Sequence, residues 1–114
     1  MEILEVVSAD AGEQVTVSLK GELDLSTVAK VEEELRRVEA SDATLLVLDL
    51  SGLSFLDSTG LRAVITADER ARAQGRRFVI VKGPDAVQRV FAITRLEERL
   101  EMVDDDSSLS DGST

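Results

Sequence analysis

The fold of this 114-residue chain is decided by the stretch Val47-Leu-Asp-Leu-Ser-Gly-Leu-Ser-Phe-Leu-Asp-Ser-Thr-Gly-Leu61. It opens within the continuous apolar run 45–48, which is typical of a strand buried on both faces, and we expect this strand to close at residues 49–52. Past the turn at Gly60, apolar residues recur on one helical arc. They are Leu61, Val64, Ile65, Ala67 and Ala71. Asp68 lies close to this arc, where the pattern offers no reason for a carboxylate.

Upstream of this stretch, the sequence predicts a hairpin and a helix. Residues 3–7 are mostly apolar, and residues 15–19 alternate apolar and polar side chains with the period of a half-buried strand. The turn-forming residues 10–13 between them favour an antiparallel hairpin. Residues 21–24 break the alternation, and residues 28–38 carry apolar side chains at helical spacing. The candidate N-caps of this helix are Asp24, Ser26 and Thr27.

Downstream, further helix and strand signals follow. Gly75 is a natural end for the helix after the turn. Residues 78–81 form another short apolar run, and Pro84 fits the first position of a third helix. A last short strand is expected near residues 100–103, and the Asp-, Ser- and Gly-rich residues 104–114 are expected to form a disordered acidic tail. The order β-β-α-β-α-β-α-β predicts a mixed sheet with βαβ crossovers, that is, an α/β fold.

The composition narrows the class of protein. Lys and Arg number 13 against 23 Asp and Glu, and the net charge of -10 argues against nucleic acid or an anionic membrane as partner. The chain has no Cys and no His, which excludes a Ser-His-Asp triad and the usual zinc ligands. We therefore expect no metal and no cofactor. Because no run is long enough to span a membrane and the first residues do not resemble a signal peptide, we expect a cytoplasmic protein.

The turn after the buried strand is the candidate site. Strand-to-helix turns lie at the carboxyl edge of a sheet, where ligands and partners bind. This turn places the hydroxyls of Ser58 and Thr59 beside Asp57, and Gly60 leaves room for another molecule to approach the backbone. Helix capping by Asp57 or Ser58 would explain the turn by itself. Alternatively, Ser58 is a phosphoacceptor, because a helix start tolerates a phosphate whose added charge repels a partner.

Enzymatic interpretations of the turn find little support. A nucleophile elbow around Ser58 would need Gly two residues away on each side, and Leu56 stands at one of these positions. A phosphate-binding loop with the pattern Gly-x-x-x-x-Gly-Lys is absent from the sequence. We therefore expect a binding protein and not an enzyme. A small nucleotide-binding protein is the alternative from another class.

Gly21-Glu-Leu-Asp24 and the stretch 47–61, at their spacing in this chain, resemble the anti-sigma factor antagonists. These proteins belong to the sulfate transporter and anti-sigma factor antagonist (STAS) domain family. The resemblance covers residues 3–103. It implies a single STAS-like domain over residues 1–103, with a mixed sheet of four to five strands and helices packed mainly on one face. It also implies a monomer.

The resemblance implies a function as well. An unphosphorylated antagonist binds an anti-sigma factor that is also an ATP-dependent serine kinase, and this binding releases the sigma factor. Phosphorylation of the Ser after the Asp, here Ser58, inactivates the antagonist, and a metal-dependent serine phosphatase restores it. Thr59 is the alternative acceptor. The residues that the resemblance assigns to partner binding are Asp24, Asp57, Ser58, Thr59, Gly60, Leu61 and Arg62.

Two features depart from the family pattern. Arg95 stands where many members have a Gly after the third helix, so this turn is expected to differ. The acidic tail replaces most of a final helix that many members have. Neither departure affects the region of Ser58. The alternative function within the same fold is that of a soluble subunit of a lipid transporter or part of a stress-signalling scaffold.

Overall fold

The predicted order of strands and helices is confirmed in the computed structural model, which describes residues 3–105. The elements are β1 (Glu5–Ala11), β2 (Gln14–Leu23), α1 (Val28–Glu39), β3 (Leu45–Leu56), α2 (Ser58–Ala73), β4 (Arg77–Val81), α3 (Asp85–Ile93), η1 (Leu96–Glu98) and β5 (Glu101–Val103). The sequence did not indicate the 3₁₀ helix η1. The expected tail, residues 104–114, lies almost wholly outside the described residues.

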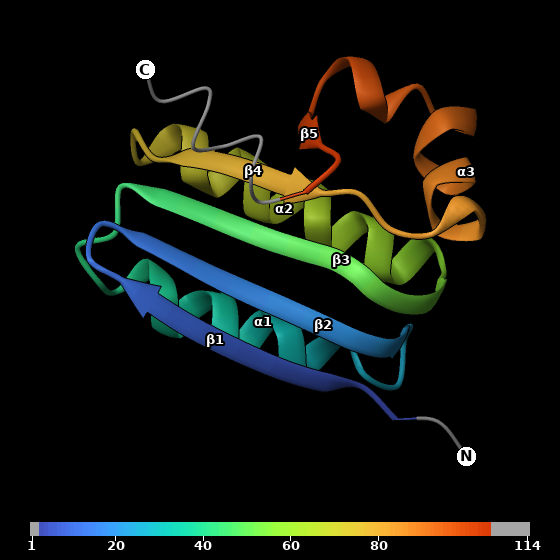
Figure 1. Ribbon diagram of the computed structural model, residues 1–114, viewed down its shortest axis with the longest axis horizontal. Coiled ribbons are helices and arrows are strands. Elements are labelled where there is room, and N and C mark those ends of the chain that lie inside the picture. The colour runs from blue at the N-terminus through green and yellow to red at the C-terminus, as the bar shows by residue number, and fades with distance from the viewer. Residues whose placement is uncertain (1–2, 106–114) are drawn as a thin grey trace.

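The five strands form one sheet in the order β1-β2-β3-β4-β5, so strands that follow one another in the chain lie side by side (Figure 1). β1 pairs antiparallel with β2, and every other pair is parallel. This arrangement confirms the predicted mixed sheet, because parallel neighbours need the crossover connections that α1, α2 and α3 supply. The ends of β2 and β3 lie together, with Leu23 paired to Leu56.

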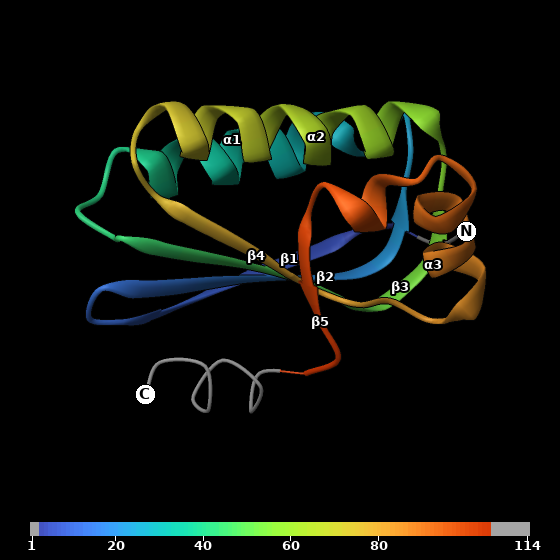
Figure 2. The same cartoon turned by 90° about the horizontal axis from the view of Figure 1, so that it is seen from above.

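The long helices α1 and α2 lie side by side on one face of the sheet, as predicted, and α3 contacts β3 (Figure 2). The main core fills the space between these helices and the sheet. The helices contribute Val31, Leu35, Val38, Leu61, Val64, Ala67, Ala71, Val87 and Phe91. Each fully buried Val, Leu or Phe side chain contributes roughly 1.5 to 3 kcal/mol relative to exposure, so apolar packing against the sheet holds the helices in place.

β2 and β3 are longer than the sequence predicts. We expected β3 to close at residues 49–52, whereas it continues to Leu56, and β2 continues through residues 21–23. The pairing of the two strands shifts register around Gly21. The φ of Gly21 is 117°, and a Cβ there would lie 2.1 Å from the carbonyl oxygen of Ile3, so only glycine fits this bulge. The broken alternation marked this bulge and not the end of a strand.

The ends of the helices agree with the sequence-based predictions, except at the start of α3. Pro84 is the N-cap of α3 and not its first residue, because its ψ of 166° is extended. Gly75 follows α2 with a φ of 73°, as predicted for the residue after a helix. Thr27 is the N-cap of α1, and its hydroxyl donates to the carbonyl of Glu22 at 2.8 Å. Arg95 has a φ of 60°, so this turn adopts the left-handed conformation without a glycine.

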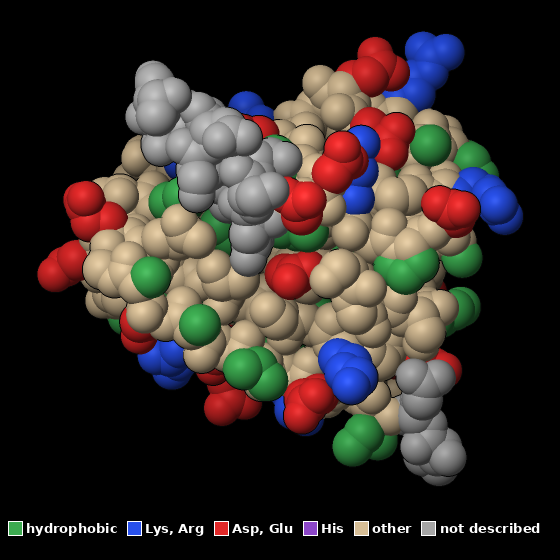
Figure 3. Space-filling model, viewed as in Figure 1, with side chains coloured by type: hydrophobic (Ala, Val, Ile, Leu, Met, Phe, Trp, Pro, Cys, Tyr) green, Lys and Arg blue, Asp and Glu red, His purple; other side chains and the backbone are tan. Residues whose placement is uncertain are grey.

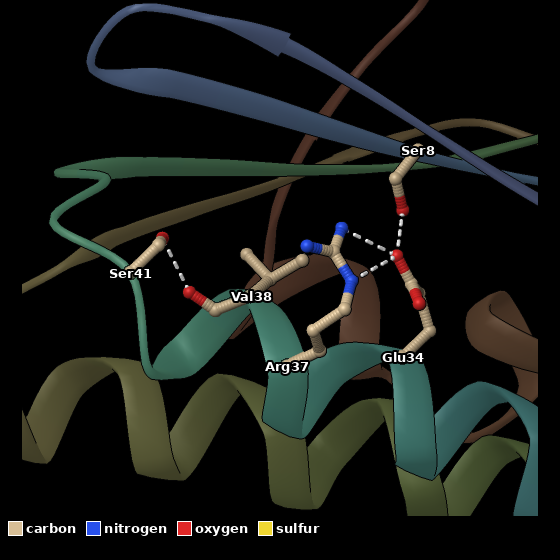
Figure 4. A network of polar contacts seen from close by, with 5 residues as sticks. All are labelled: Ser8, Glu34, Arg37, Val38 and Ser41. Carbon is tan, nitrogen blue, oxygen red and sulfur yellow. Dashed lines mark hydrogen bonds and ion pairs between the residues drawn. The ribbon is translucent and has the colours of Figure 1, made fainter.

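Polar side chains fasten α1 to the edge strand β1 (Figure 4). The carboxylate of Glu34 accepts hydrogen bonds from the guanidinium of Arg37 at 2.7 Å and from the hydroxyl of Ser8 in β1. Arg37, and after it Ser8, hold the pKa of Glu34 below its usual value. At the end of α1, the hydroxyl of Ser41 donates to the carbonyl of Val38 at 2.6 Å. The bond from Ser8 ties α1 to the sheet edge, whereas the other bonds lie within α1 and the turn that follows it.

Asp68, for which the sequence pattern offers no role, is the only charged residue within residues 3–105 that is buried. Its Oδ2 accepts a hydrogen bond from Nε of Arg72 at 2.9 Å, one helical turn further along α2. Arg72 also donates to the carbonyl of Arg99 at 2.8 Å. The carboxylate therefore fixes the side chain that joins α2 to the segment before β5.

The face of the sheet opposite the helices is seen from the front in Figure 3. Acidic, basic and apolar side chains are interspersed on it. A small second core lies on this side, made of Val47, Val79 and Val81 with the half-buried Leu45 and Val103. None of the helices within residues 3–105 is long and apolar enough to cross a membrane.

Candidate functional site

The candidate site lies where β3 ends and α2 begins, at the carboxyl edge of the sheet. Asp57 is the N-cap of α2: its backbone is extended, and its Oδ1 accepts a hydrogen bond from the N–H of Gly60 at 2.9 Å. This bond satisfies one of the N–H groups that the first turn of a helix leaves without an internal partner. The capping interpretation is therefore confirmed for Asp57, and it leaves the hydroxyl of Ser58 available.

The loop between β2 and α1 approaches the same turn. Oδ2 of Asp57 accepts the N–H of Leu25 at 3.3 Å, and the N–H of Asp57 donates to the carbonyl of Leu23 at 3.3 Å. Within this loop, Oδ1 of Asp24 accepts both the hydroxyl of Ser26 at 2.7 Å and its N–H at 2.9 Å. The Ser26 hydroxyl holds the pKa of Asp24 below its usual value. The bonds from Ser26 therefore favour the charged form of Asp24.

The two hydroxyls of the turn differ in accessibility. Ser58 and Thr59 are the first two residues of α2. Ser58 is exposed, whereas Thr59 is half-buried. Arg62, one turn further along the helix, is exposed as well. An enzyme that modifies this turn therefore has more direct access to Ser58 than to Thr59.

Gly60 and Leu61 point into the protein. A Cβ on Gly60 would lie 2.7 Å from Cγ of Leu23 and 2.8 Å from Cδ1 of Leu56, and Leu61 is 7 % exposed. The sequence suggested that Gly60 leaves room for another molecule to approach. The structure corrects this reason, because the protein's own leucines occupy that room. Gly60 lets α2 approach the ends of β2 and β3 closely, and so it supports the site from beneath.

Two surface hollows meet at the turn. The first, of about 540 Å³, runs along α2 and is lined by Ser58, Thr59, Leu61, Arg62, Ile65, Thr66 and Glu69. The second, of about 500 Å³, is lined by Asp24, Leu25, Ser26, Phe55 and Asp57. The neighbours Asp57 and Ser58 each line one of them. A protein that covers Ser58 can therefore contact both hollows at once. The two motifs of the sequence, residues 21–24 and 47–61, meet at this turn.

The sequence did not single out two apolar residues of the second hollow. Leu25 is 75 % exposed and Phe55 is 47 % exposed. The only available signal for Leu25 was a large apolar side chain within a polar capping segment. Phe55 gave no signal, because the apolar residues around it in β3 suggest burial. Exposed large apolar side chains that lie together mark surfaces for protein contacts.

Comparison with known proteins identifies relatives along nearly the whole chain. A model of the STAS domain family, described as "Mlab, STAS domain", matches residues 7–104. The anti-sigma-F factor antagonist RsfB of Mycobacterium tuberculosis is 32% identical over 111 residues, which is 97% of this chain and 88% of that protein. Both motifs of the candidate site lie within the matched residues.

Solved structures share the fold. An anti-sigma factor antagonist from Mycobacterium paratuberculosis superposes with a TM-score of 0.85 at 26% identity, covering 92% of this chain and 89% of that one. SpoIIAA, an anti-sigma factor antagonist, matches in its unphosphorylated form with a TM-score of 0.78 at 19% identity, covering 96% of both chains. Its phosphorylated form matches with a TM-score of 0.72 at 20% identity, covering 93% of this chain and 97% of that one.

Proposed function

The chain belongs to the STAS domain family of the anti-sigma factor antagonists, which are regulatory binding proteins and not enzymes, and on this premise we propose its specific role. Unphosphorylated, it binds an anti-sigma factor that is an ATP-dependent serine kinase, in the cytoplasm and as a monomer, and so releases the sigma factor. The observation that carries the proposal is the place of Ser58: an exposed hydroxyl on the first residue of a helix, directly after a capping carboxylate.

Ser58 is the phosphoacceptor in this proposal. The partner kinase transfers the γ-phosphoryl group of ATP to Oγ: the bond between Oγ and phosphorus forms, the bond from that phosphorus to ADP breaks, and the hydroxyl proton passes to a catalytic base of the kinase. A metal-dependent serine phosphatase later cleaves the phosphate ester with water and restores the hydroxyl. The half-buried Thr59 is the less accessible acceptor. This chain is the substrate of both reactions.

The fold tolerates the phosphate while a bound partner does not. Ser58 lies at a helix N-terminus, where free N–H groups and the helix dipole favour an anion, and it is exposed, so the core is not touched. A partner packed over the turn would have to remove about two negative charges from water. Phosphorylation therefore weakens the complex without unfolding the domain.

The surface around Ser58 fits a partner that has basic groups around an apolar centre. Leu25 and Phe55 offer apolar contact area, and Asp24 and Asp57 line the same hollow as carboxylates. An apolar centre with a charged rim is the usual arrangement of a protein interface. The net charge of -10 adds long-range attraction to a basic partner. We assign direct partner contacts to the exposed or half-buried members of the predicted set, which are Asp24, Asp57, Ser58, Thr59 and Arg62. The buried Gly60 and Leu61 have a supporting role.

Affinity capture from a lysate of the source cell, followed by mass spectrometry, tests this function. The baits are the wild-type chain, Ser58→Ala, Ser58→Asp and a control, Thr44→Asp. Thr44 is exposed and precedes β3 at the end opposite to Ser58, so the control adds the same charge away from the turn. An ATP-binding kinase-like protein is expected on every bait except Ser58→Asp.

Other outcomes would support other functions. Equal capture of the kinase by Ser58→Ala and Ser58→Asp would refute the switch. Membrane transport components on all four baits would favour the subunit of a lipid transporter, and other signalling proteins on all four would favour a scaffold. Tight ATP or GTP binding by the purified chain, lost in Ser58→Asp and kept in Thr44→Asp, would favour a nucleotide-binding protein.

A further inference from the structure

Arg62 lies one helical turn beyond Ser58 on α2. Residues four apart on a helix are neighbours on its surface, with Cβ atoms roughly 5 to 6 Å apart. Helical side chains lean toward the N-terminus, so Arg62 leans toward Ser58. Both residues are exposed and both line the same hollow. A group attached to Oγ of Ser58 therefore lies within reach of the Arg62 guanidinium.

The guanidinium of Arg62 is not committed elsewhere. The ion pairs within residues 3–105 involve other side chains. Asp57, the nearest acid in the sequence, already accepts the N–H groups of Gly60 and Leu25. Glu69 lines the same hollow two turns beyond Arg62 and forms no ion pair with it. Arg62 is thus a cation available to a new anion at position 58.

We propose that the guanidinium of Arg62 binds the phosphate on Ser58 once Ser58 has been phosphorylated. This inference rests on the proposed phosphorylation and adds what happens to the phosphate afterwards. A guanidinium matches phosphate oxygens with two parallel hydrogen bonds, which makes Arg the residue best suited to hold this group. The helix N-terminus contributes less than it otherwise would, because the N–H of Gly60 already donates to Asp57.

Because Arg62 binds the phosphate, phosphorylation affects partner binding in two ways. In the unphosphorylated protein, the donors of Arg62 are available to the partner. In the phosphorylated protein, its donors are occupied by the protein's own phosphate. The modification therefore adds negative charge beside Asp57 and at the same time withdraws the nearest positive charge from the interface. Loss of Arg62 is expected to weaken partner binding even without phosphate.

The test uses the full chain with phosphoserine inserted at position 58 during translation. ³¹P NMR measures the second pKa of the phosphate in this protein and in its Arg62→Gln, Arg62→Lys and Arg36→Gln variants. Arg36 is exposed in the last turn of α1, so its substitution removes the same charge at a remote place. Because Arg62 favours the doubly charged phosphate, Arg62→Gln is expected to raise this pKa by about 0.2 to 0.4 unit.

The other variants complete the test. Arg36→Gln is expected to leave the phosphate pKa within about 0.1 unit, because screening by salt weakens remote charges. Arg62→Lys keeps the charge without the paired donors and is expected to fall between wild type and Arg62→Gln. An unchanged pKa in Arg62→Gln, or an equal rise in Arg36→Gln, overturns the inference. The measurement needs no kinase or partner, so its result is independent of whether the proposed function holds in the cell.

Discussion

Asp57 and Leu25 are separated by 32 positions in the chain, and the carboxylate of Asp57 accepts the N–H of Leu25 at 3.3 Å. The same carboxylate caps α2 through Gly60. One side chain therefore holds the loop of the first motif and the helix of the second in a fixed relation. The proposed partner surface exists before any partner arrives, which lowers the entropic cost of binding.

Replacement of Asp57 is expected to destabilise the protein. Asp57→Ala removes the cap of α2 and the bond to Leu25, so the free energy of unfolding in urea should fall by about 1 kcal/mol, within the range of 0.5 to 2 kcal/mol for lost caps. Asp42→Ala is the control, since Asp42 is exposed in the loop after α1. Equal stability of Asp57→Ala and the wild type would show that the cap does not hold the turn.

Gly60→Ala is expected to destabilise the protein although alanine favours helices. The new Cβ would lie within 2.9 Å of three atoms of Leu23 and Leu56, one of them a backbone carbonyl oxygen. Such overpacking costs about 1 to 3 kcal/mol, against a gain of about 1 kcal/mol in helix propensity. Urea unfolding measures the balance. Thr66→Ala, on the same helix in a half-buried place, should show no loss; a stabilised Gly60→Ala would contradict the packing argument.

Arg72→Ala is expected to cost about 1 to 3 kcal/mol of unfolding free energy, because it leaves the buried carboxylate of Asp68 without its partner. The double variant Asp68→Leu with Arg72→Ala should recover much of this loss, since the carboxylate is then absent as well. Urea unfolding of both variants is the measurement, with Arg36→Ala as the control for loss of an exposed Arg. A double variant less stable than Arg72→Ala would refute this account.

The pH dependence of stability is expected to involve Glu34. Its pKa is lowered in the folded protein, by Arg37 first and then by Ser8. A carboxyl with a lowered pKa stabilises the fold above its unfolded pKa, near 4.3, and this stabilisation is lost as pH falls through the folded pKa. Glu34→Gln should therefore lose less stability than wild type between pH 6 and about pH 3. Unfolding curves at several pH values measure this, with the exposed Glu33→Gln as control; parallel curves for Glu34→Gln and wild type would contradict it.

Arg95→Gly is expected to stabilise the protein. Arg95 has a φ of 60° and a ψ of 21°, a left-handed conformation that costs a residue with a side chain roughly 1 to 2 kcal/mol. Glycine avoids this cost but loses more entropy on folding, so the net gain should be about 0.5 to 1 kcal/mol. Thermal unfolding measures it. Arg95→Ala keeps the strain and should give no such gain; a less stable Arg95→Gly would show that the arginine side chain holds this turn.

Local patterns in the sequence predicted most of the fold. Alternation, helical periodicity and turn residues gave the order of the elements, and the residues around Ser58 gave the strand, cap and helix of the candidate site. The predicted end of β3 was wrong, because the second half of this strand depends on pairing with β2 past the bulge at Gly21. Such pairing between distant segments leaves no signal in either segment alone.

Hydrogen bonds from a side chain of one element to another element could also not be predicted from the sequence. The guanidinium of Arg76 donates to the carbonyl oxygens of Glu39 at 2.6 Å and Ser41 at 2.8 Å and so closes the end of α1, a role that its place in the sequence does not indicate. The sequence offered no reason for a carboxylate at Asp68. In the structure Asp68 accepts a hydrogen bond from Arg72, which also donates to the carbonyl of Arg99. The exposure of Leu25 and Phe55 depends on how the loop after β2 meets β3, which is a property of the assembled fold.

Every residue that lines the two hollows at the Ser58 turn comes from the continuous segment 24–69, which runs from the end of β2 into α2. The parallel pairing of β2 with β3 makes this possible, because it returns the chain to the same edge after a single crossover. The proposed recognition surface is thus confined to one continuous segment of the sequence, and β4, α3 and β5 contribute no lining residue to it. Relatives that serve different partners can diverge at the lining positions while the rest of the domain evolves separately, and exchanging this segment between two such relatives should exchange their partners.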